Sequence, residues 1–476
     1  MTRYVLASLV LLVPCYWQPR IQAGDLSSHI YNAWLADLID NGGAQGLVIV
    51  RQNTNVLFDL ILGSLMRVVG PSVAEHIAVS LTVLIFVWGA FVLVSTMSGH
   101  RSVHHLPVIA MLTYGWVFHI GFFNFYLSLG LCLWALALMW NPALPRLVGA
   151  LPLLTVAYLG HALPVAWAGS IIGYMTLRRH SVRLGHVVVL LCPVLLIIIA
   201  LVIAAIWPAS WSSRQVTLAT GLDQILVYDG KYLLPFVGLA ELWGVRLLTL
   251  VRTFGVASLV AGCPFQIAAM TAAAIVLLPG AVWLPGFHHS LVFIPERMSL
   301  ASAVLACGVL GRIPHRPFER NLSIALMLVF FAFLYRDECA LNGLEARLAT
   351  AVDPLPLGRR VVSAIDDPGL RINAVTHMID RVCVGRCYSY ANYEPSTAAF
   401  RVRAVAENPV VASTYADSWA LQTGTYLVKE RDLPLYVVDL NTKGQTVVRP
   451  AKVGVPTGRT EYDVLLGRRR AQAKAG

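Results

Sequence analysis

The sequence predicts an α-helical polytopic membrane protein of about eleven transmembrane helices, followed by a small C-terminal soluble α/β domain. Hydrophobic residues make up 57% of the chain and charged residues only 13%, whereas a soluble globular protein has about 25% charged residues. The charges are also unevenly distributed, because residues 1–335 carry 10 of the 25 acids and 17 of the 36 bases. We therefore expect a transmembrane domain over 1–335, a soluble extracytoplasmic domain over 336–464 and a basic tail over 465–476.

Apolar runs mark the predicted spans. Several are shorter than the roughly 20 residues of a full span, so their ends are expected to extend into neighbouring polar residues. The region 231–263 is the least regular, because Glu241 and Arg246 interrupt its apolar pattern. The first run is expected to be retained, because the bulky segment CYWQPRIQAGD after it offers no small-x-small cleavage site. The runs are 4–17, 77–97, 106–122, 124–140, 148–160, 162–177, 187–207, 233–251, 262–284, 298–311 and 321–335.

Arginine-bearing loops orient the predicted bundle. Arg3 precedes the first run, and the loops RRHSVRLGH (178–186) and RIPHRPFER (312–320) fall on the same side if the chain crosses eleven times. The positive-inside rule makes that side cytoplasmic. The prediction is a multi-pass protein of the bacterial inner membrane with a cytoplasmic N-terminus and a periplasmic C-terminal domain. Most acids of the first 335 residues fall in the opposite loops, so chemistry is expected on the outer face.

The C-terminal domain contains short sequence patterns typical of strands and of a helix. RRVVSAI (359–365) and LPLYVVDL (433–440) are typical of strands, and NAVTHMIDRVCVGRCYSY (373–390) predicts a helix that leads into a turn or strand. Three cysteines, Cys339, Cys383 and Cys387, would lie in an oxidising compartment, and we expect one disulfide among them.

The first outer loop carries the strongest candidate for a site. The stretch AGDLSSHIYNAWLADLIDNG begins at Ala23, and its apolar residues from Leu26 to Leu38 recur every four positions. This pattern predicts an interfacial amphipathic helix, with Trp34 at headgroup depth. A second interfacial helix is expected over NVLFDLILGSLMRVV (55–69). Asp25 would then stand at the outer end of the first membrane helix, where a charge usually has a function.

This layout resembles the GT-C superfamily of membrane glycosyltransferases. The features that carry the resemblance are the acidic residue in GDLSSH (24–29), the interfacial helices, the many-span bundle, the outer C-terminal domain and the segment IPERMSL (294–300). The resemblance implies transfer of a sugar from a polyprenyl-phosphate-linked donor to an acceptor on the outer face. Members of that superfamily often have two adjacent acids after the first helix, whereas this chain has Gly24 and Asp25. No cofactor is therefore indicated, and the metal dependence stays open.

Six residues are the predicted site. An inverting transfer needs a carboxylate as general base and cations to hold the leaving phosphate. Asp25 is the predicted base, and Arg297 is expected to bind the lipid-linked phosphate in the same cavity. The predicted substrate-binding residues are His29, Arg214, Lys231, Glu296 and Arg297.

Each of these residues also has a structural interpretation. Asp25 fits the N-cap of a helix equally well, and His29 is typical of a polar group on a helix face. Glu296 and Arg297 fit a surface ion pair or an anchor at the membrane interface. The adjacent His288 and His289 would make a metal pair only in a loop, because neighbouring residues on a helix point apart.

Two other classes of function remain open on the sequence alone. A transporter or flippase of a lipid-linked saccharide is disfavoured, because the spans hold few ionisable groups and no internal repeat is visible. A non-catalytic membrane assembly protein fits the same pattern. The predicted partners are a lipid-linked sugar donor and membrane lipid. Nucleic acid is not expected, because the arginines cluster in short loops between apolar runs.

Overall fold

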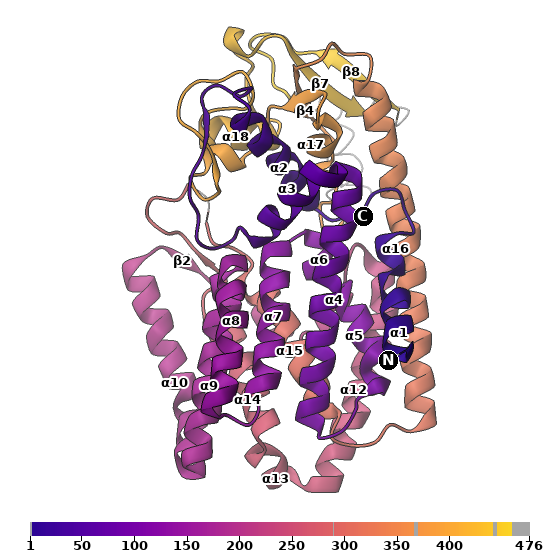
Figure 1. The fold of residues 1–476 in the computed structure, drawn as a ribbon, viewed down its shortest axis with the longest axis vertical. Coiled ribbons are helices and arrows are strands. Elements are labelled where there is room, and N and C mark those ends of the chain that lie inside the picture. Colours follow the sequence, from indigo (N-terminus) through magenta and orange to yellow (C-terminus); the bar gives the residue numbers. More distant parts are fainter. Residues whose placement is uncertain (1, 289, 366–369, 441–444, 459–476) are drawn as a thin grey trace, which may run out of the picture. The chain divides into compact units, whose positions relative to one another are not determined.

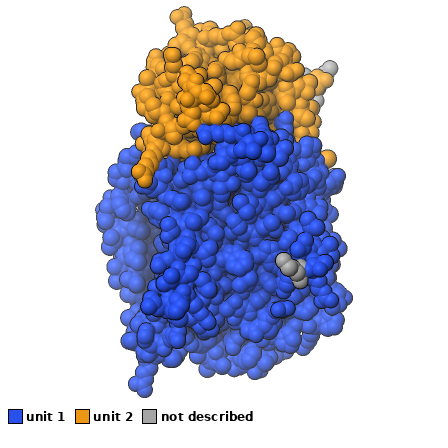
Figure 2. Space-filling view, in the orientation of Figure 1, with its two compact units in different colours: residues 1–21, 52–338, 369–372 blue, residues 22–51, 339–368, 373–476 orange. Residues whose placement is uncertain are grey.

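The computed structural model describes residues 2–288, 290–365, 370–440 and 445–458, and it is mostly helical. The chain divides into two compact units, coloured separately in Figure 2. Unit 1 comprises residues 1–21, 52–338 and 369–372, and unit 2 comprises residues 22–51, 339–368 and 373–476. The segment 22–51, which begins the expected first outer loop, thus belongs to the same unit as the C-terminal domain.

Unit 1 is a bundle of helices, several of which run side by side in Figure 1. Helix α7 packs against α4, α8 and α9, while α14 packs against α10 and α15. The helical elements are α1 (Thr2–Leu12), η1 (Val13–Cys15), α3 (Leu57–Val69), α4 (Pro71–Ser98), η2 (Val103–His105), α5 (Leu106–Thr113), α6 (Trp116–Ile120), α7 (Phe123–Met139), α8 (Leu144–Gly160), α9 (Ala162–His180), α10 (Val182–Ile206), α11 (Gln215–Leu218), η3 (Leu222–Ile225), η4 (Gly230–Tyr232), α12 (Leu233–Phe254), α13 (Val256–Ala261), α14 (Cys263–Leu277), α15 (Ile294–Leu310) and the first part of α16 (Pro317–Val352).

Three helices in the described part of the chain are long and apolar enough to cross a membrane: α4, α10 and the segment Gly230–Phe254. Helix α10 exposes nearly all of its apolar side chains, from Val182 to Ile206, as expected of a surface that meets lipid. Other apolar helices, such as α7 and α8, are shorter than a full span. The structure supports a membrane protein, and the number of eleven spans stays a prediction.

Two expected spans are interrupted. The run 106–122 forms two short helices, because the chain turns at Gly115 against Gln224. A side chain at Gly115 would lie 2.7 Å from the Gln224 carbonyl oxygen, and Gln224 Oε1 accepts a hydrogen bond of 3.1 Å from the backbone of Val117. The run 262–284 ends as a helix at Leu277, and Ala281–Val282 (β3) then pairs with Ala209–Ser210 (β2).

The irregular region around Glu241 and Arg246 is a continuous helix, α12. The buried guanidinium of Arg246 pairs with Glu319 at 2.5 Å and donates to the carbonyl oxygens of Leu310 and Ile313. A buried charge is stable only when it is paired and hydrogen-bonded in this way. Arg246 therefore joins α12 to the end of α15, to the start of α16 and to the segment between them.

Unit 2 combines short helices with two small sheets. Its elements are α2 (Leu26–Asp40), β1 (Leu47–Ile49), the rest of α16, β4 (Arg359–Ser363), α17 (Met378–Cys383), β5 (Cys387–Ser389), η5 (Glu394–Ser396), β6 (Val402–Ala404), α18 (Tyr415–Gln422), η6 (Glu430–Asp432), β7 (Leu435–Leu440) and β8 (Thr446–Pro450). Strand β4 lies parallel to β5 and β7, β8 is antiparallel to β7, and β1 pairs separately with β6. The predicted strands at 359–365 and 433–440 are confirmed as β4 and β7.

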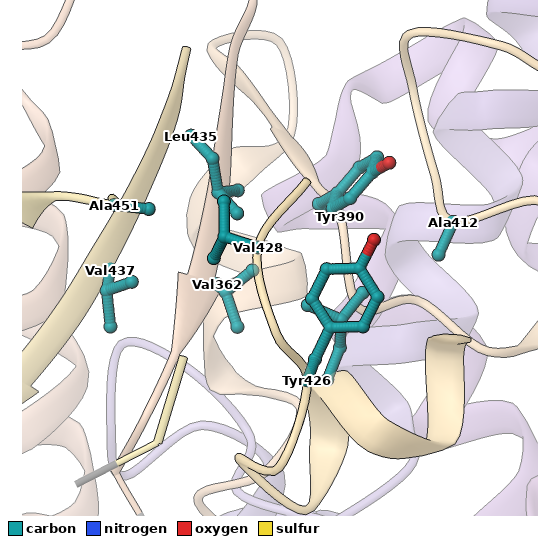
Figure 3. Close-up of a cluster of buried hydrophobic side chains, with 9 residues drawn as sticks. Val362, Tyr390, Ala412, Tyr426, Val428, Leu435, Val437 and Ala451 are labelled. Carbon is teal, nitrogen blue, oxygen red and sulfur yellow. The ribbon is translucent and has the colours of Figure 1, made fainter. Parts of the chain in front are cut away.

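A small apolar core supports this sheet (Figure 3). It gathers side chains from β4, β7 and the segments around them, among them Val362, Leu435 and Val437. Tyr390 and Tyr426 belong to it too, and both hydroxyl groups donate to Asp432 at 2.8 Å. Buried tyrosines usually need such a partner, and here one buried carboxylate fixes both rings.

The predicted interfacial helix at 26–40 differs from expectation. Both the apolar and the polar faces of α2 are buried within unit 2, including Ser28 and Asn32. The reason is that α17 packs against α2 and that residues of the segment 389–394 hydrogen-bond to its polar side chains. The second helix, α3, retains the expected exposed apolar residues Leu60, Val68 and Val69.

The structure pairs Cys383 with Cys387 in a disulfide and leaves Cys339 exposed and free. This confirms the prediction of one disulfide among the three. The expected basic tail at 465–476 and His289 lie outside the described residues.

Candidate functional site

Asp25 occupies the position just before α2, but it does not cap the helix. Its side chain makes no capping hydrogen bond within the described part of the chain. It is instead 28% exposed, with Oδ1 at 3.9 Å from Nε2 of His377. The structure therefore favours a carboxylate that faces a histidine over an N-cap.

His377 is held in one orientation by Asp380, which lies three residues further along the chain. Nδ1 of His377 and Oδ2 of Asp380 are 2.8 Å apart, and the hydroxyl of Ser389 donates to the other oxygen of Asp380. Because the carboxylate of Asp380 can only accept a hydrogen bond, Nδ1 of His377 carries a proton, and Nε2 is the ring nitrogen that faces Asp25. The three residues Asp25, His377 and Asp380 are called the unit 2 cluster below.

The charges around His377 favour its protonated form. Burial by itself lowers the pKa of His377, but the hydrogen bond to Asp380 and the negative charges of Asp380, Asp25 and Glu394 outweigh burial and raise the pKa above its usual value. The imidazole therefore keeps its second proton to a higher pH than an unperturbed histidine does.

The polar face of α2 fixes the surroundings of this cluster. Ser28 donates to Glu394 at 3.0 Å, and Asn392 donates to Asn32 at 2.8 Å. The hydroxyl of Tyr31 accepts the backbone N–H of Ser389 at 2.9 Å, and the side chain of this serine binds Asp380. These bonds hold α2 against the segment that carries Ser389, and such support limits the movement of functional groups.

Arg297 lies in unit 1, in the first turn of α15. Its guanidinium covers the ring of Phe122 at 3.8 Å from the centroid, and Nη1 lies 3.3 Å from Nε2 of His161. His161 joins α8 to α9. The side chains of Arg297, His161 and Phe122 are called the unit 1 cluster below.

The hydrogen bonding of His161 shows what this cluster can bind. Burial, together with the charge of Arg297, lowers the pKa of His161 to about 3, so the ring is neutral at physiological pH. Its Nδ1 accepts the backbone N–H of Leu163 at 3.1 Å, which places the single proton on Nε2. Nε2 then presents an N–H group beside the N–H groups of Arg297. Adjacent N–H donors of this kind suit the oxygens of an anion.

Neighbouring residues fix the start of α15. Gln224 donates to the carbonyl oxygen of Glu296 at 2.9 Å and to Ser299 at 2.8 Å, and Ser299 donates to Asp223 at 3.0 Å. Burial raises the pKa of Asp223 to about 7, against the opposing effect of Arg371. Phe293, directly before the helix, has φ of 58°, a conformation that is costly for a bulky residue and typical of functional sites.

The other predicted binding residues have different surroundings. The backbone carbonyl oxygen of Glu296 accepts a hydrogen bond from Gln224, and the side chain of Glu296 is half-buried. Lys231 pairs with Asp229 at 3.0 Å and with Asp337 at 2.5 Å, so two carboxylates balance its charge. Arg214 is exposed beside the short helix α11, and His29 is half-buried on α2.

The structure thus places Asp25 and His29 in unit 2, and Arg214, Lys231, Glu296 and Arg297 in unit 1. The expectation that Asp25 and Arg297 line one cavity stays a prediction, because they belong to different units. Sequence reasoning missed His377, Asp380 and His161. The H-x-x-D spacing in THMID is a signal for the first two, whereas a single histidine after Gly160 gives little signal.

No group of three or more histidine, cysteine or acidic side chains suited to a metal ion occurs among the described residues. No family model, no curated protein and no solved structure matches the chain. The function must therefore be argued from the two clusters themselves.

Proposed function

We propose that this protein is a membrane glycosyltransferase that moves a sugar from a polyprenyl-phosphate-linked donor to an acceptor on the outer face of the bacterial inner membrane. The observation that carries the proposal is the unit 2 cluster: Asp25 is partly exposed, does not cap its helix, and faces a histidine fixed by Asp380. The sequence layout that resembles the GT-C superfamily supports the same assignment. Eleven spans and a periplasmic unit 2 are part of this proposal.

Asp25 is the proposed general base. Its carboxylate takes the proton from the acceptor hydroxyl as that oxygen attacks the anomeric carbon of the donor sugar. The new glycosidic bond forms on the side opposite the leaving group, and the bond from the anomeric carbon to the phosphate oxygen breaks. The electron pair of that bond leaves with the polyprenyl phosphate, and the proton remains on Asp25 until solvent removes it. His377 acts as a positioning residue, because its Nε2 side faces the carboxylate.

The unit 1 cluster is the proposed binding site for the leaving phosphate. Arg297 supplies a planar set of donors suited to phosphate oxygens, and the N–H of neutral His161 adds one more. These groups stabilise the negative charge that grows on the phosphate in the transition state.

The test is an assay of the full chain in lipid membranes with radiolabelled polyprenyl-phosphate sugars and a membrane acceptor fraction. Asp25→Asn keeps the size of the side chain but removes the base, so it should lower the rate by at least about 100-fold. Asp40→Asn is the matched control, because Asp40 is an exposed carboxylate at the other end of α2. Its rate should equal that of the unmodified protein.

Two results would contradict the proposal. A fully active Asp25→Asn protein would show that Asp25 is not the base. Transbilayer movement of the labelled donor without sugar transfer, in the unmodified protein, would indicate a flippase.

A further inference from the structure

A polar cavity lies in unit 2, apart from the residues of the unit 2 cluster. Its volume is about 300 Å³, which is room for roughly ten water molecules and comparable with a single hexose. Its lining includes Arg360, Arg431, Glu407 and Asp417. Pockets for apolar ligands are lined mainly by hydrophobic side chains, so this lining points to a polar ligand.

Two side chains of the lining, Arg360 and Tyr390, are held in place. Arg360 donates to the carbonyl oxygens of Pro409 and Arg431 at 2.8 and 2.7 Å, and its guanidinium lies 5.2 Å from the ring centre of Tyr390. Tyr390 belongs to the apolar core drawn in Figure 3, and its hydroxyl donates a hydrogen bond to Asp432. A preformed lining of this kind lowers the entropy cost of binding.

The charges in the lining balance one another. Arg431 pairs with Glu407 and lies 3.5 Å from Asp417, while Lys429 also contacts Asp417 at 3.0 Å. Two arginines and two carboxylates give the lining no net charge, which disfavours both phosphate and a cation. A guanidinium has five N–H donors and a carboxylate about four acceptor positions, so the ion pairs leave donors and acceptors for a ligand. A hydroxyl group can both donate and accept a hydrogen bond, so the hydroxyl groups of a ligand can bind the arginine donors and the carboxylate acceptors of this lining.

We propose that this cavity binds a neutral saccharide unit. Sugar hydroxyl groups bridge the arginine and carboxylate edges, and Tyr390 with Arg360 forms one wall. This site does not depend on the proposed transfer reaction, because none of its residues belongs to either cluster. If the protein is a transferase, the cavity would bind the saccharide part of a substrate or product.

Saturation-transfer NMR on the full chain in lipid nanodiscs tests this, with the methyl glycosides of glucose, galactose and mannose as probes. Binding of at least one probe to the unmodified protein is expected, with inorganic phosphate unable to displace it. Arg431→Met should weaken binding at least tenfold, because Arg431 joins both carboxylates. Arg386→Met is the matched control: Arg386 forms an ion pair of 3.4 Å with Asp353 in the same unit but does not line the cavity.

Asp417→Asn, which preserves shape, provides a second variant and should also weaken binding if Arg431→Met does not fold. The proposal is overturned if no probe binds to the folded unmodified protein, if folded variants bind normally, or if phosphate displaces the sugar. Asp25→Asn should bind sugar as the unmodified protein does. If the Asp25→Asn protein is fully active and still binds sugar, Asp25 is not the catalytic base, but the cavity remains a sugar-binding site.

Discussion

His377 in unit 2 and His161 in unit 1 are both shielded from solvent beside a charged residue, yet they respond in opposite directions. His377 lies between Asp380 and Asp25, which raise its pKa against the effect of burial. His161 lies beside Arg297, and burial and that positive charge both lower its pKa. The sign of the neighbouring charge thus decides the protonation state of each ring.

This difference shows how one residue type can favour two different protonation states in one protein. A histidine with a raised pKa can hold a proton beside a carboxylate. A histidine that stays neutral presents one N–H and adds no positive charge of its own. Each property follows from the residues that surround the ring. For His377 these are the nearby Asp380 and the distant Asp25, and for His161 the distant Arg297.

The largest expected effect concerns stability in acid. The pKa of His161 is about 3 in the folded protein and about 6.5 in the unfolded chain, so its contribution to stability is present above pH 6.5 and is lost as the pH falls. We expect a loss on the order of 2 kcal/mol between pH 6.5 and pH 4. In thermal melts, His161→Gln should reduce this acid sensitivity.

His377→Gln provides the opposite case. Since the folded pKa of His377 is raised, its contribution is present below about pH 6.5 and is lost as the pH rises through the folded value. The variant should therefore lose most stability at acid pH. Equal pH slopes for both variants would refute the contrast between the two histidines.

Arg297→Lys is the next largest effect. Lysine keeps the charge but loses the planar set of donors, so phosphate binding should weaken by roughly 10- to 50-fold. Equilibrium binding of polyprenyl phosphate in nanodiscs measures this. Arg146→Lys is the control, because Arg146 is an exposed arginine of the same unit that is not among the predicted binding residues. Normal phosphate binding by Arg297→Lys would support a simple interface anchor.

Asp380→Asn should have a smaller effect, about a tenfold loss of transferase rate, because one charged hydrogen bond to His377 becomes neutral. The pKa of His377 should fall, since a charge that raises it is removed. The pH–rate profile should therefore shift toward lower pH. A reduced rate with an unshifted profile would mean that Asp380 only supports the fold.

The smallest effect is expected at Cys339, which is exposed and forms no disulfide. Cys339→Ser should change the free energy of unfolding by less than about 0.5 kcal/mol. In unreduced protein, mass spectrometry should find alkylation of Cys339 but not of Cys383 or Cys387, whose disulfide closes the turn between α17 and β5. Alkylation of all three would contradict the disulfide and the oxidising compartment.

The sequence by itself determined the features that depend on local pattern. Low charge and long apolar runs predicted a helical membrane protein, and short segments rich in valine and other apolar residues located β4 and β7. These signals are local, because burial of a helix or strand requires apolar residues at a regular spacing in the chain. The position of Asp25 just before a helix was visible for the same reason.

Only the tertiary structure decided which residues surround Asp25 and Arg297. The partners His377 and His161 come from distant segments, and no periodicity connects them with the residues they face. The helix break at Gly115 is likewise set by Gln224, and the polar face of α2 is buried because residues 389–394 hydrogen-bond to it. Hydrogen bonds and ion pairs act over a few ångströms in space. The contacts that give a histidine its protonation state therefore exist only after the chain has folded.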